Sequence, residues 1–457
     1  MSGISNHHLP ELPRSPEIED FRLNNGMQVI LCRMPGLHRI SVLLNVKSGC
    51  RDERLPGTAH LLEHLIFRGS QSHPSLRELS EAFETFGADF NAYTAREVTS
   101  FDVLMPVESF EPVMHLLGST MSHPRLTGIA AERDIIREEI ISDYDADGSL
   151  INVEDLLVSL FYGESGRPIA GDPGDLEKLT KQEVQDFYRA HYAASNMILV
   201  IAGPLGQRSD IKVLLEDAFG ELPSTHSPWR RRDIPEIYGN ALKSGHAPDP
   251  RLVVRRYDGA TQSDIILGFL CREASHKEFS VLEMLVRVLD DGMASRLSRR
   301  LVEELALVYD AEAYLSTTQE STLLQIRVSC RHRRVSRLVE SVYQLLREIA
   351  ETPIPAEELQ RLRRRVIWEH LGLLDGVASF CQWVSTMTLQ SLPHDIEKRC
   401  RRLLSVDADD IRTMAAQLLS DRSHVVAVVG DLGEKAAQDL HHTMSQALNQ
   451  NVTLTLM

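Results

Sequence analysis

The chain has 457 residues, a formal net charge of −16 and 43% hydrophobic residues. This length exceeds what one core usually serves, so it predicts two domains of about 200 residues each. No apolar run approaches the roughly 18 residues of a membrane-spanning helix, and we expect no membrane span. The first twenty residues lack the apolar stretch of a signal peptide and are too acidic for a transit peptide, so we expect a cytoplasmic protein.

Charge is distributed unevenly. Residues 1–222 carry 34 acidic and 19 basic residues, whereas the remainder carries 31 and 30. An acidic field attracts cationic ligands, so a preference for basic peptides is one hypothesis; a solubilising acidic surface explains the same numbers. Residues 361–365 (Arg-Leu-Arg-Arg-Arg) form only a local basic helix face, and nucleic acid is not an expected partner. The six cysteines form no C-x-x-C motif and predict reduced, mostly buried thiols.

The first element along the chain is a turn at residues 24–26 that leads into a strand at 27–30. The next is a helix that begins after Pro56-Gly57, with Thr58 as its expected N-cap. Its apolar positions, which are Leu61, Leu62, Leu65 and Ile66, form rows four residues apart and predict a buried face.

The opposite face of this helix carries the string His-Leu-Leu-Glu-His at residues 60–64. His60 and His64 are four residues apart, so both imidazoles leave the same face and can bind one zinc ion. Glu63 lies at the same edge, where a carboxylate can accept a proton from a water on the metal. The string is the inverted form of the H-E-x-x-H zinc peptidase signature. The alternative is a surface helix with scattered polar groups, which the apolar opposite face disfavours.

A catalytic zinc site needs a third protein ligand. Residues 127–144 predict a second amphipathic helix, on which Glu132 and Glu139 lie seven residues apart on one face. Two turns separate them by about 10 Å, so one zinc ion cannot bind both. One would be a ligand and the other would orient the ligands or the water.

These motifs together resemble the pitrilysin family of zinc metallopeptidases, most closely its short two-domain subunits such as the mitochondrial processing peptidase and bacterial peptide-maturation peptidases. The resemblance implies that Glu139 is the third ligand, that Glu132 supports catalysis, and that Glu138 is neither. It extends from about residue 20 to about residue 450. The segment 87–94 is similar to the family's N-A-x-T segment, which implies that Asn91 and Ala92 meet the substrate backbone beside an edge strand. A hairpin or bulge position is the alternative for Asn91.

An internal repeat indicates two similar halves. Residues 179–205 align without gaps to residues 406–432, and each copy reads as a helix, a turn and an apolar strand. We expect an N-terminal zinc domain at 1–222, a linker at 223–250 and a C-terminal domain without the zinc motif at 251–457. Strands and helices do not alternate regularly, which predicts an α+β fold in which each domain packs a mostly antiparallel sheet with helices.

One position departs from the family pattern. Family members carry an Arg and a Tyr seven residues apart in the second half, which contact the substrate carbonyl. Here Tyr309 matches the tyrosine, but Val302 occupies the place of the arginine. This departure predicts a heterodimer with a related subunit that supplies the missing contact; a homodimer that works with Tyr309 alone is the alternative.

The sequence therefore predicts a metalloendopeptidase with one Zn²⁺ per chain, held by His60, His64 and Glu139. Glu63 is the expected base, with Glu132 in support. The expected substrate is an extended peptide or a flexible precursor segment. A non-catalytic subunit that binds or presents peptides is the alternative function.

Overall fold

The computed structural model describes residues 9–457 apart from 207, 225–249, 273–274, 319–320 and 422. The predicted linker at 223–250 thus lies almost entirely outside the described residues. In the part of the chain that is described, no helix is long and apolar enough to cross a membrane.

The first half contains a six-stranded mixed sheet in the order β1-β2-β6-β3-β5-β4. Only β2 and β6 are parallel; the other neighbours are antiparallel. The strands are β1 (Glu17–Arg22), β2 (Gln28–Arg33), β3 (Arg39–Val46), β4 (Asp89–Thr94), β5 (Thr99–Pro106) and β6 (Met197–Gly203). Strand β6 reads Met-Ile-Leu-Val-Ile-Ala-Gly and is buried along its whole length, as expected of a central strand covered on both faces.

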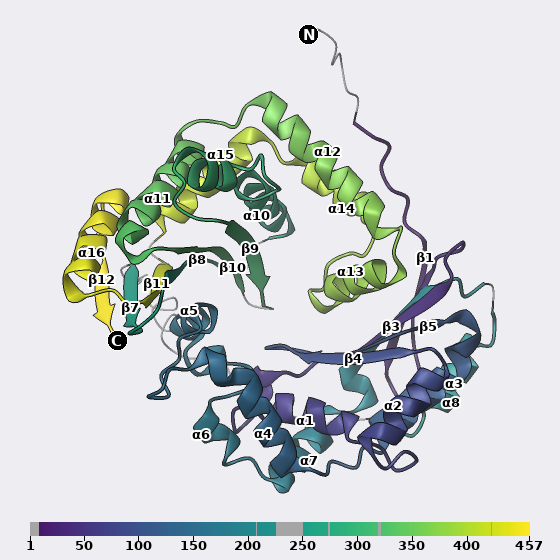
Figure 1. Cartoon of the computed structure of the whole chain (residues 1–457). Coiled ribbons are helices and arrows are strands. Elements are labelled where there is room, and N and C mark those ends of the chain that lie inside the picture. The colour runs from purple at the N-terminus through teal and green to yellow at the C-terminus, as the bar shows by residue number, and fades with distance from the viewer. Residues whose placement is uncertain (1–8, 207, 225–249, 273–274, 319–320, 422) are drawn as a thin grey trace.

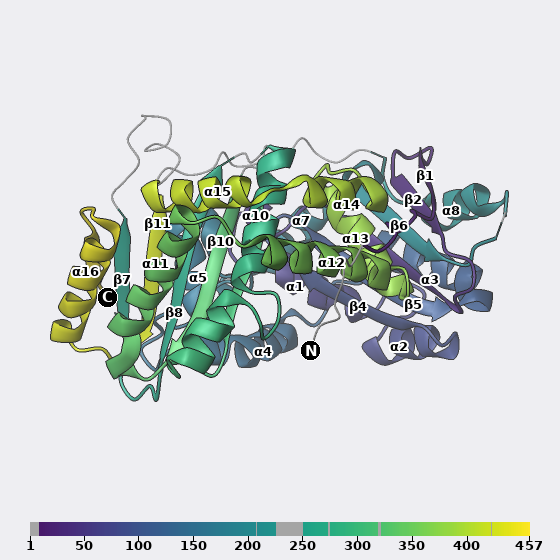
Figure 2. The ribbon, with the colours of Figure 1, turned by 90° about the horizontal axis from the view of Figure 1, so that it is seen from above.

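The second half repeats this plan in the order β12-β7-β11-β8-β10-β9. Its strands are β7 (Arg251–Arg256), β8 (Ser263–Arg272), β9 (Ala311–Thr317), β10 (Ser321–Cys330), β11 (His424–Gly430) and β12 (Thr453–Leu456). Strand β11 is parallel to β7 and antiparallel to β8, just as β6 is parallel to β2 and antiparallel to β3. The two copies of the sequence repeat therefore hold equivalent places in the two sheets. The predicted α+β class with two mostly antiparallel sheets is confirmed (Figure 2).

Helices cover one face of each sheet and enclose a separate hydrophobic core. In the first half these are α1 (Thr58–Phe67), α2 (Leu76–Thr85), α3 (Phe110–Ser122), α4 (Ile129–Ile140), α6 (Pro173–Leu176), α7 (Lys181–His191) and α8 (Ile211–Phe219). In the second half they are α10 (His276–Leu289), α11 (Val335–Glu351), α12 (Ala356–Leu373), α14 (Ile396–Ser405), α15 (Ala408–Ser420) and α16 (Glu434–Leu448).

Two helices cross between the halves (Figure 1). Helix α5 (Val153–Tyr162) lies between the first-half helices α4 and α6 in sequence, yet its apolar side packs against β8, β10 and β11 of the second sheet. Helix α13 (Val377–Leu389) belongs to the second half and packs against β2, β3 and β6 of the first sheet. Each sheet is thus covered on its inner face by a helix from the other half. The boundaries at 222 and 251 remain a prediction, but this exchange makes the two halves depend on each other.

The exchange predicts a stability effect. Phe161 is 1% exposed, and it packs so closely on β8 that a Cβ at Gly268 would lie 2.7 Å from its ring. We expect Phe161→Ala to lower the free energy of unfolding by about 3–5 kcal/mol, because it leaves a cavity between the halves. Urea denaturation followed by circular dichroism measures this, with the exposed Val213→Ala as a control. A loss below about 1 kcal/mol would show that α5 does not depend on the second sheet.

Candidate metal centre and active site

Helix α1 carries the predicted string on a face that points away from the core. Its apolar residues Leu61, Leu62, Leu65 and Ile66 are fully buried, as their spacing predicts. The N-cap is Gly57 (φ +84°), whereas Thr58 is the first helical residue, so the expected Thr58 cap is wrong. The free N–H groups of this terminus are satisfied by Glu53, whose carboxylate accepts from Gly57 and Ala59 at 2.8 and 2.9 Å. A buried acid from the preceding turn therefore fixes where the helix begins.

His60, His64 and Glu139 converge at one point and form a group that could hold a metal ion. The two Nε2 atoms are 3.0 Å apart, and the Glu139 carboxylate oxygens lie 3.8 Å from His60 Nε2 and 3.6 Å from His64 Nε2. Ligands about 2.0–2.1 Å from a tetrahedral zinc ion stand about 3.3 Å apart. The spacing of these donor atoms is close to that value.

The protonation of His60 also suits a metal. Burial, followed by the effect of neighbouring His64, lowers the pKa of His60 to about 4, so this ring is neutral at ordinary pH. Its buried Nδ1 has no hydrogen-bond partner among the described residues. Two imidazole nitrogens that face each other beside a carboxylate are a donor set that zinc prefers, and the neutral His60 ring has a lone pair to offer.

Glu132 orients this group without joining it. It is 5% exposed, and its carboxylate lies 3.0 Å from His64 Nδ1. When Nδ1 carries the proton and donates to this carboxylate, His64 Nε2 keeps its lone pair for a metal. Arg68, the C-cap residue of α1, forms an ion pair with the other oxygen of Glu132. The two glutamates of α4 thus hold different places: Glu139 is among the possible donors, and Glu132 lies behind His64.

Glu63 faces the same cavity as the three donors. This cavity has a volume of about 410 Å³ and is also lined by residues 92–94, 143–144 and 168–171. Burial raises the pKa of Glu63, while a 2.7 Å hydrogen bond from Thr94 Oγ1 acts in the opposite direction. The sequence alone assigned no role to Arg68, or to Thr94 at the end of the N-A-x-T segment. Strand parity places Thr94 on the same side as Ala92, but only the packing of β4 against α1 shows that it reaches Glu63.

The predicted substrate residues Asn91 and Ala92 lie on β4, the edge strand of the first sheet. Asn91 pairs with Asp102 of β5 within an unbroken register, so it is neither at a hairpin turn nor at a bulge. Ala92 lines the cavity, whereas Asn91 is exposed and does not. The free edge of β4 therefore runs beside the three donors.

Tyr309 does not join this group. It is 97% exposed and lines a different cavity in the second half, together with Arg331 and Arg334. Val302 lies half-buried in a π-helix, Ser298–Glu304, that precedes it. Arg299 and Arg300 of that helix do not take the place of the missing arginine. Both form ion pairs with Glu304 at the end of the same helix.

Comparison with known proteins gives consistent matches along the chain. A family model described as insulinase (Peptidase family M16) matches residues 28–171, and one described as Peptidase M16 inactive domain matches residues 178–366. An uncharacterized zinc protease of Streptomyces coelicolor is 25% identical, covering 93% of this chain and 92% of its own. The uncharacterized zinc protease YmxG of Bacillus subtilis is 24% identical, with coverage of 91% and 99%.

Solved structures show the same fold. A protease from Helicobacter pylori has a TM-score of 0.81 at 19% identity and covers 91% of this chain and 99% of its own. The first half of the periplasmic protease PqqL from Escherichia coli has a TM-score of 0.73 at 19% identity, with coverage of 98% and 100%.

The contact between Arg68 and Glu132 can be tested through metal affinity. Arg68→Met leaves the Glu132 carboxylate without its cation, so its hold on His64 weakens. We expect the zinc affinity to fall about 10–100-fold, as measured by competition with a chromophoric chelator. Arg77→Met is the matched control, since the ion pair that Arg77 makes within the described residues is with exposed Glu81 on α2. Equal affinities in both variants would contradict an orienting role for Glu132.

Proposed function

Because the chain belongs to the pitrilysin (M16) family, we propose that it is a zinc-dependent endopeptidase that cleaves extended peptides or a flexible segment of a precursor. The convergence of His60, His64 and Glu139 beside Glu63 carries this proposal. The printed names of its relatives, which are zinc proteases, support the choice of metal.

The chain's own residues have distinct roles in the proposed reaction. His60, His64 and Glu139 would hold zinc, which would supply Lewis acidity toward the scissile carbonyl and toward water. Glu63 accepts the proton of the attacking water and passes it to the leaving amine. Thr94 holds the Glu63 carboxylate by its hydrogen bond at the cavity that would contain the water. Glu132 holds His64 in the tautomer that leaves Nε2 available.

The substrate is proposed to bind as an added strand along β4. The free edge of this strand lies in the first sheet next to the cavity, and its main-chain groups can pair with an extended peptide. This mode reads the peptide backbone more than its side chains, which suits unfolded segments. The acidic first half supports a preference for basic peptides, and the cytoplasmic location expected from the sequence stays a prediction.

The alternative function is a non-catalytic subunit that binds or presents peptides. The description of one matching model as an inactive domain applies to residues 178–366, which lie outside the H-x-x-E-H string. The retention of Glu63 together with all three donors favours the peptidase.

Substitution of Glu63 separates the two functions. Glu63→Gln keeps the three donors but removes the base, so we expect unchanged zinc content and a kcat lowered about 10²–10⁴-fold. Zinc content and cleavage of an unstructured peptide are measured on the same preparation. Glu138→Gln is the control, because Glu138 is exposed and adjacent to Glu139 but outside the donor group. If the unmodified protein binds zinc but cleaves no peptide, either alone or with a related partner subunit, the peptide-presenting role would be favoured.

The oligomeric state is the second part of the proposal. Val302 stands where the family resemblance implies an arginine, and Tyr309 is exposed and lies outside the cavity that is lined by the three donors. We therefore favour a heterodimer with a related subunit, ahead of a homodimer.

Gel filtration with light scattering, combined with peptide cleavage, tests this part. A heterodimer predicts that the purified chain alone is inactive and gains activity with a related partner. A homodimer predicts activity in the dimer peak that Tyr309→Phe reduces. Full activity from a monomer would contradict both arrangements.

A further inference from the structure

Residues 167–171 form one wall of the metal cavity. Pro168, Ile169, Ala170 and Gly171 all line it. The wall also touches the start of α1, since a Cβ at Gly57 would lie 2.5 Å from the carbonyl oxygen of Ala170. The wall therefore bounds the space for substrate and lies beside the N-terminus of the helix that carries His60 and His64.

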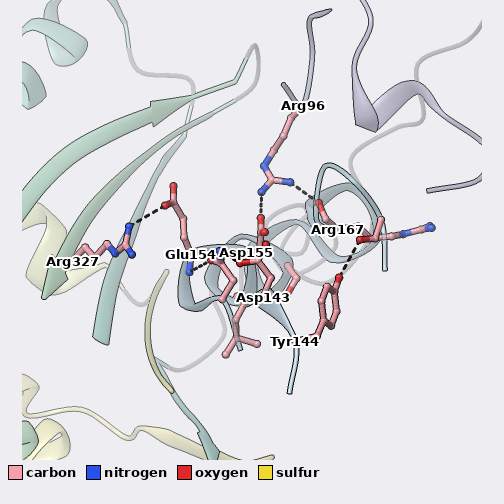
Figure 3. Close-up of polar contacts among 11 residues, drawn as sticks. Arg96, Asp143, Tyr144, Glu154, Asp155, Arg167 and Arg327 are labelled. Carbon is pink, nitrogen blue, oxygen red and sulfur yellow. Dashed lines mark hydrogen bonds and ion pairs between the residues drawn. The ribbon is translucent and has the colours of Figure 1, made fainter. Parts of the chain in front are cut away.

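Two hydrogen bonds hold the ends of the wall (Figure 3). Arg96 Nη1 donates to the carbonyl oxygen of Arg167 at 2.6 Å, and the Tyr144 hydroxyl donates to that of Gly171 at 3.1 Å. Neither side chain touches the three metal donors by any contact that the structure records. Both act on the main chain of the wall.

Arg96 is itself held by α5. Its Nη2 donates to Asp155 Oδ1 at 2.9 Å, and the two side chains are only 17% and 20% exposed. A guanidinium can serve a carbonyl and a carboxylate at once because its donors are fixed in a planar fork. Asp155 lies in the first turn of α5, next to Glu154, which is directed toward Arg327 of β10 at 3.8 Å (Figure 3).

The second sheet fixes the position of α5. The helix buries its apolar side against β8, β10 and β11, and Gly268 of β8 allows the approach of Leu157 and Phe161. A path of direct contacts thus runs from the second sheet through α5, Asp155 and Arg96 to the wall at 167–171.

We propose that Arg96 is a positioning residue for peptide cleavage: it holds the wall at 167–171 against the metal cavity, from a helix whose place is set by the second sheet. The inference rests on the proposed peptidase function only for its kinetic consequence. The positioning itself is a structural property that can be measured without activity.

Hydrogen–deuterium exchange of the amides at 169–171 tests the positioning. In Arg96→Met we expect this segment to exchange about tenfold faster or more, because a loosened wall opens more often. Arg96→Lys keeps one charged nitrogen, which cannot reach both partners, and should give an intermediate rate. Arg296→Met is the matched control: it removes an equally buried pair with Glu358, 14% and 15% exposed, and should leave 169–171 unchanged. Unchanged exchange in a folded Arg96→Met would overturn the proposal.

Gly268→Val tests the contribution of the second sheet. The valine side chain would clash with Leu157 and Phe161 and push α5 away from the second sheet. Although position 268 lies in the second half, we expect faster exchange at 169–171. Gly268→Ala is the milder variant if the valine variant does not fold. Unchanged exchange in a folded Gly268→Val would remove the second sheet from the path.

The kinetic readout distinguishes this inference from the proposed function. We expect Arg96→Met to keep its zinc affinity within about twofold and to lose about tenfold in kcat/KM, mainly through KM, because the wall places the substrate. If the unmodified protein cleaves no peptide, the proposed function fails while the exchange experiment still decides the role of Arg96. If it cleaves and Arg96→Met cleaves equally well, the positioning role in catalysis is wrong.

Discussion

The convergence of His60 and His64 on one turn of α1 is the constraint on which the rest of the site depends. Their Nε2 atoms stand 3.0 Å apart at the edge of a helix whose other face is fully buried. Polar groups in such a place destabilise the fold unless something binds them. Three glutamates surround the two histidines: Glu53 accepts hydrogen bonds from the N-terminus of the helix, Glu132 orients the His64 ring, and Glu139 completes the donor group. Each acid thus has a separate role: one caps the helix, one orients a ligand and one joins the donor group.

The exchange of helices between the halves gives this site its surroundings. Helix α5 lies under the second sheet and helix α13 lies on the first, so neither sheet has its full covering without the other half. The acidic first turn of α5 stands between the metal cavity and the second sheet. A half that lacks the zinc motif can therefore still shape the space in which a peptide would bind. This arrangement gives the second half a role in the site without a metal of its own.

Much of the fold and the centre of the site could be predicted from the sequence. The repeat at an offset of 227 residues marked β6 and β11, which hold equivalent places in their sheets. Helical spacing predicted that Glu132 and Glu139 could not bind one ion together, and the family resemblance assigned the ligand to Glu139. Periodicity fails where tertiary contacts decide the outcome. Nothing in its spacing assigns α5 to the second sheet, and Thr94 reaches Glu63 only because β4 packs against α1. The cap of α1 also differed from prediction, since a buried carboxylate four residues before Gly57 replaced the local hydroxyl.

The most direct test of this account is the coordination of zinc in the purified protein, measured by anomalous diffraction or X-ray absorption at the zinc edge. The account predicts one ion per chain, bound by two imidazole nitrogens from His60 and His64 and a carboxylate oxygen from Glu139, each about 2.0–2.2 Å away, with an open position toward Glu63. An ion bound instead by Glu132 or Glu138, or located away from α1, would contradict it.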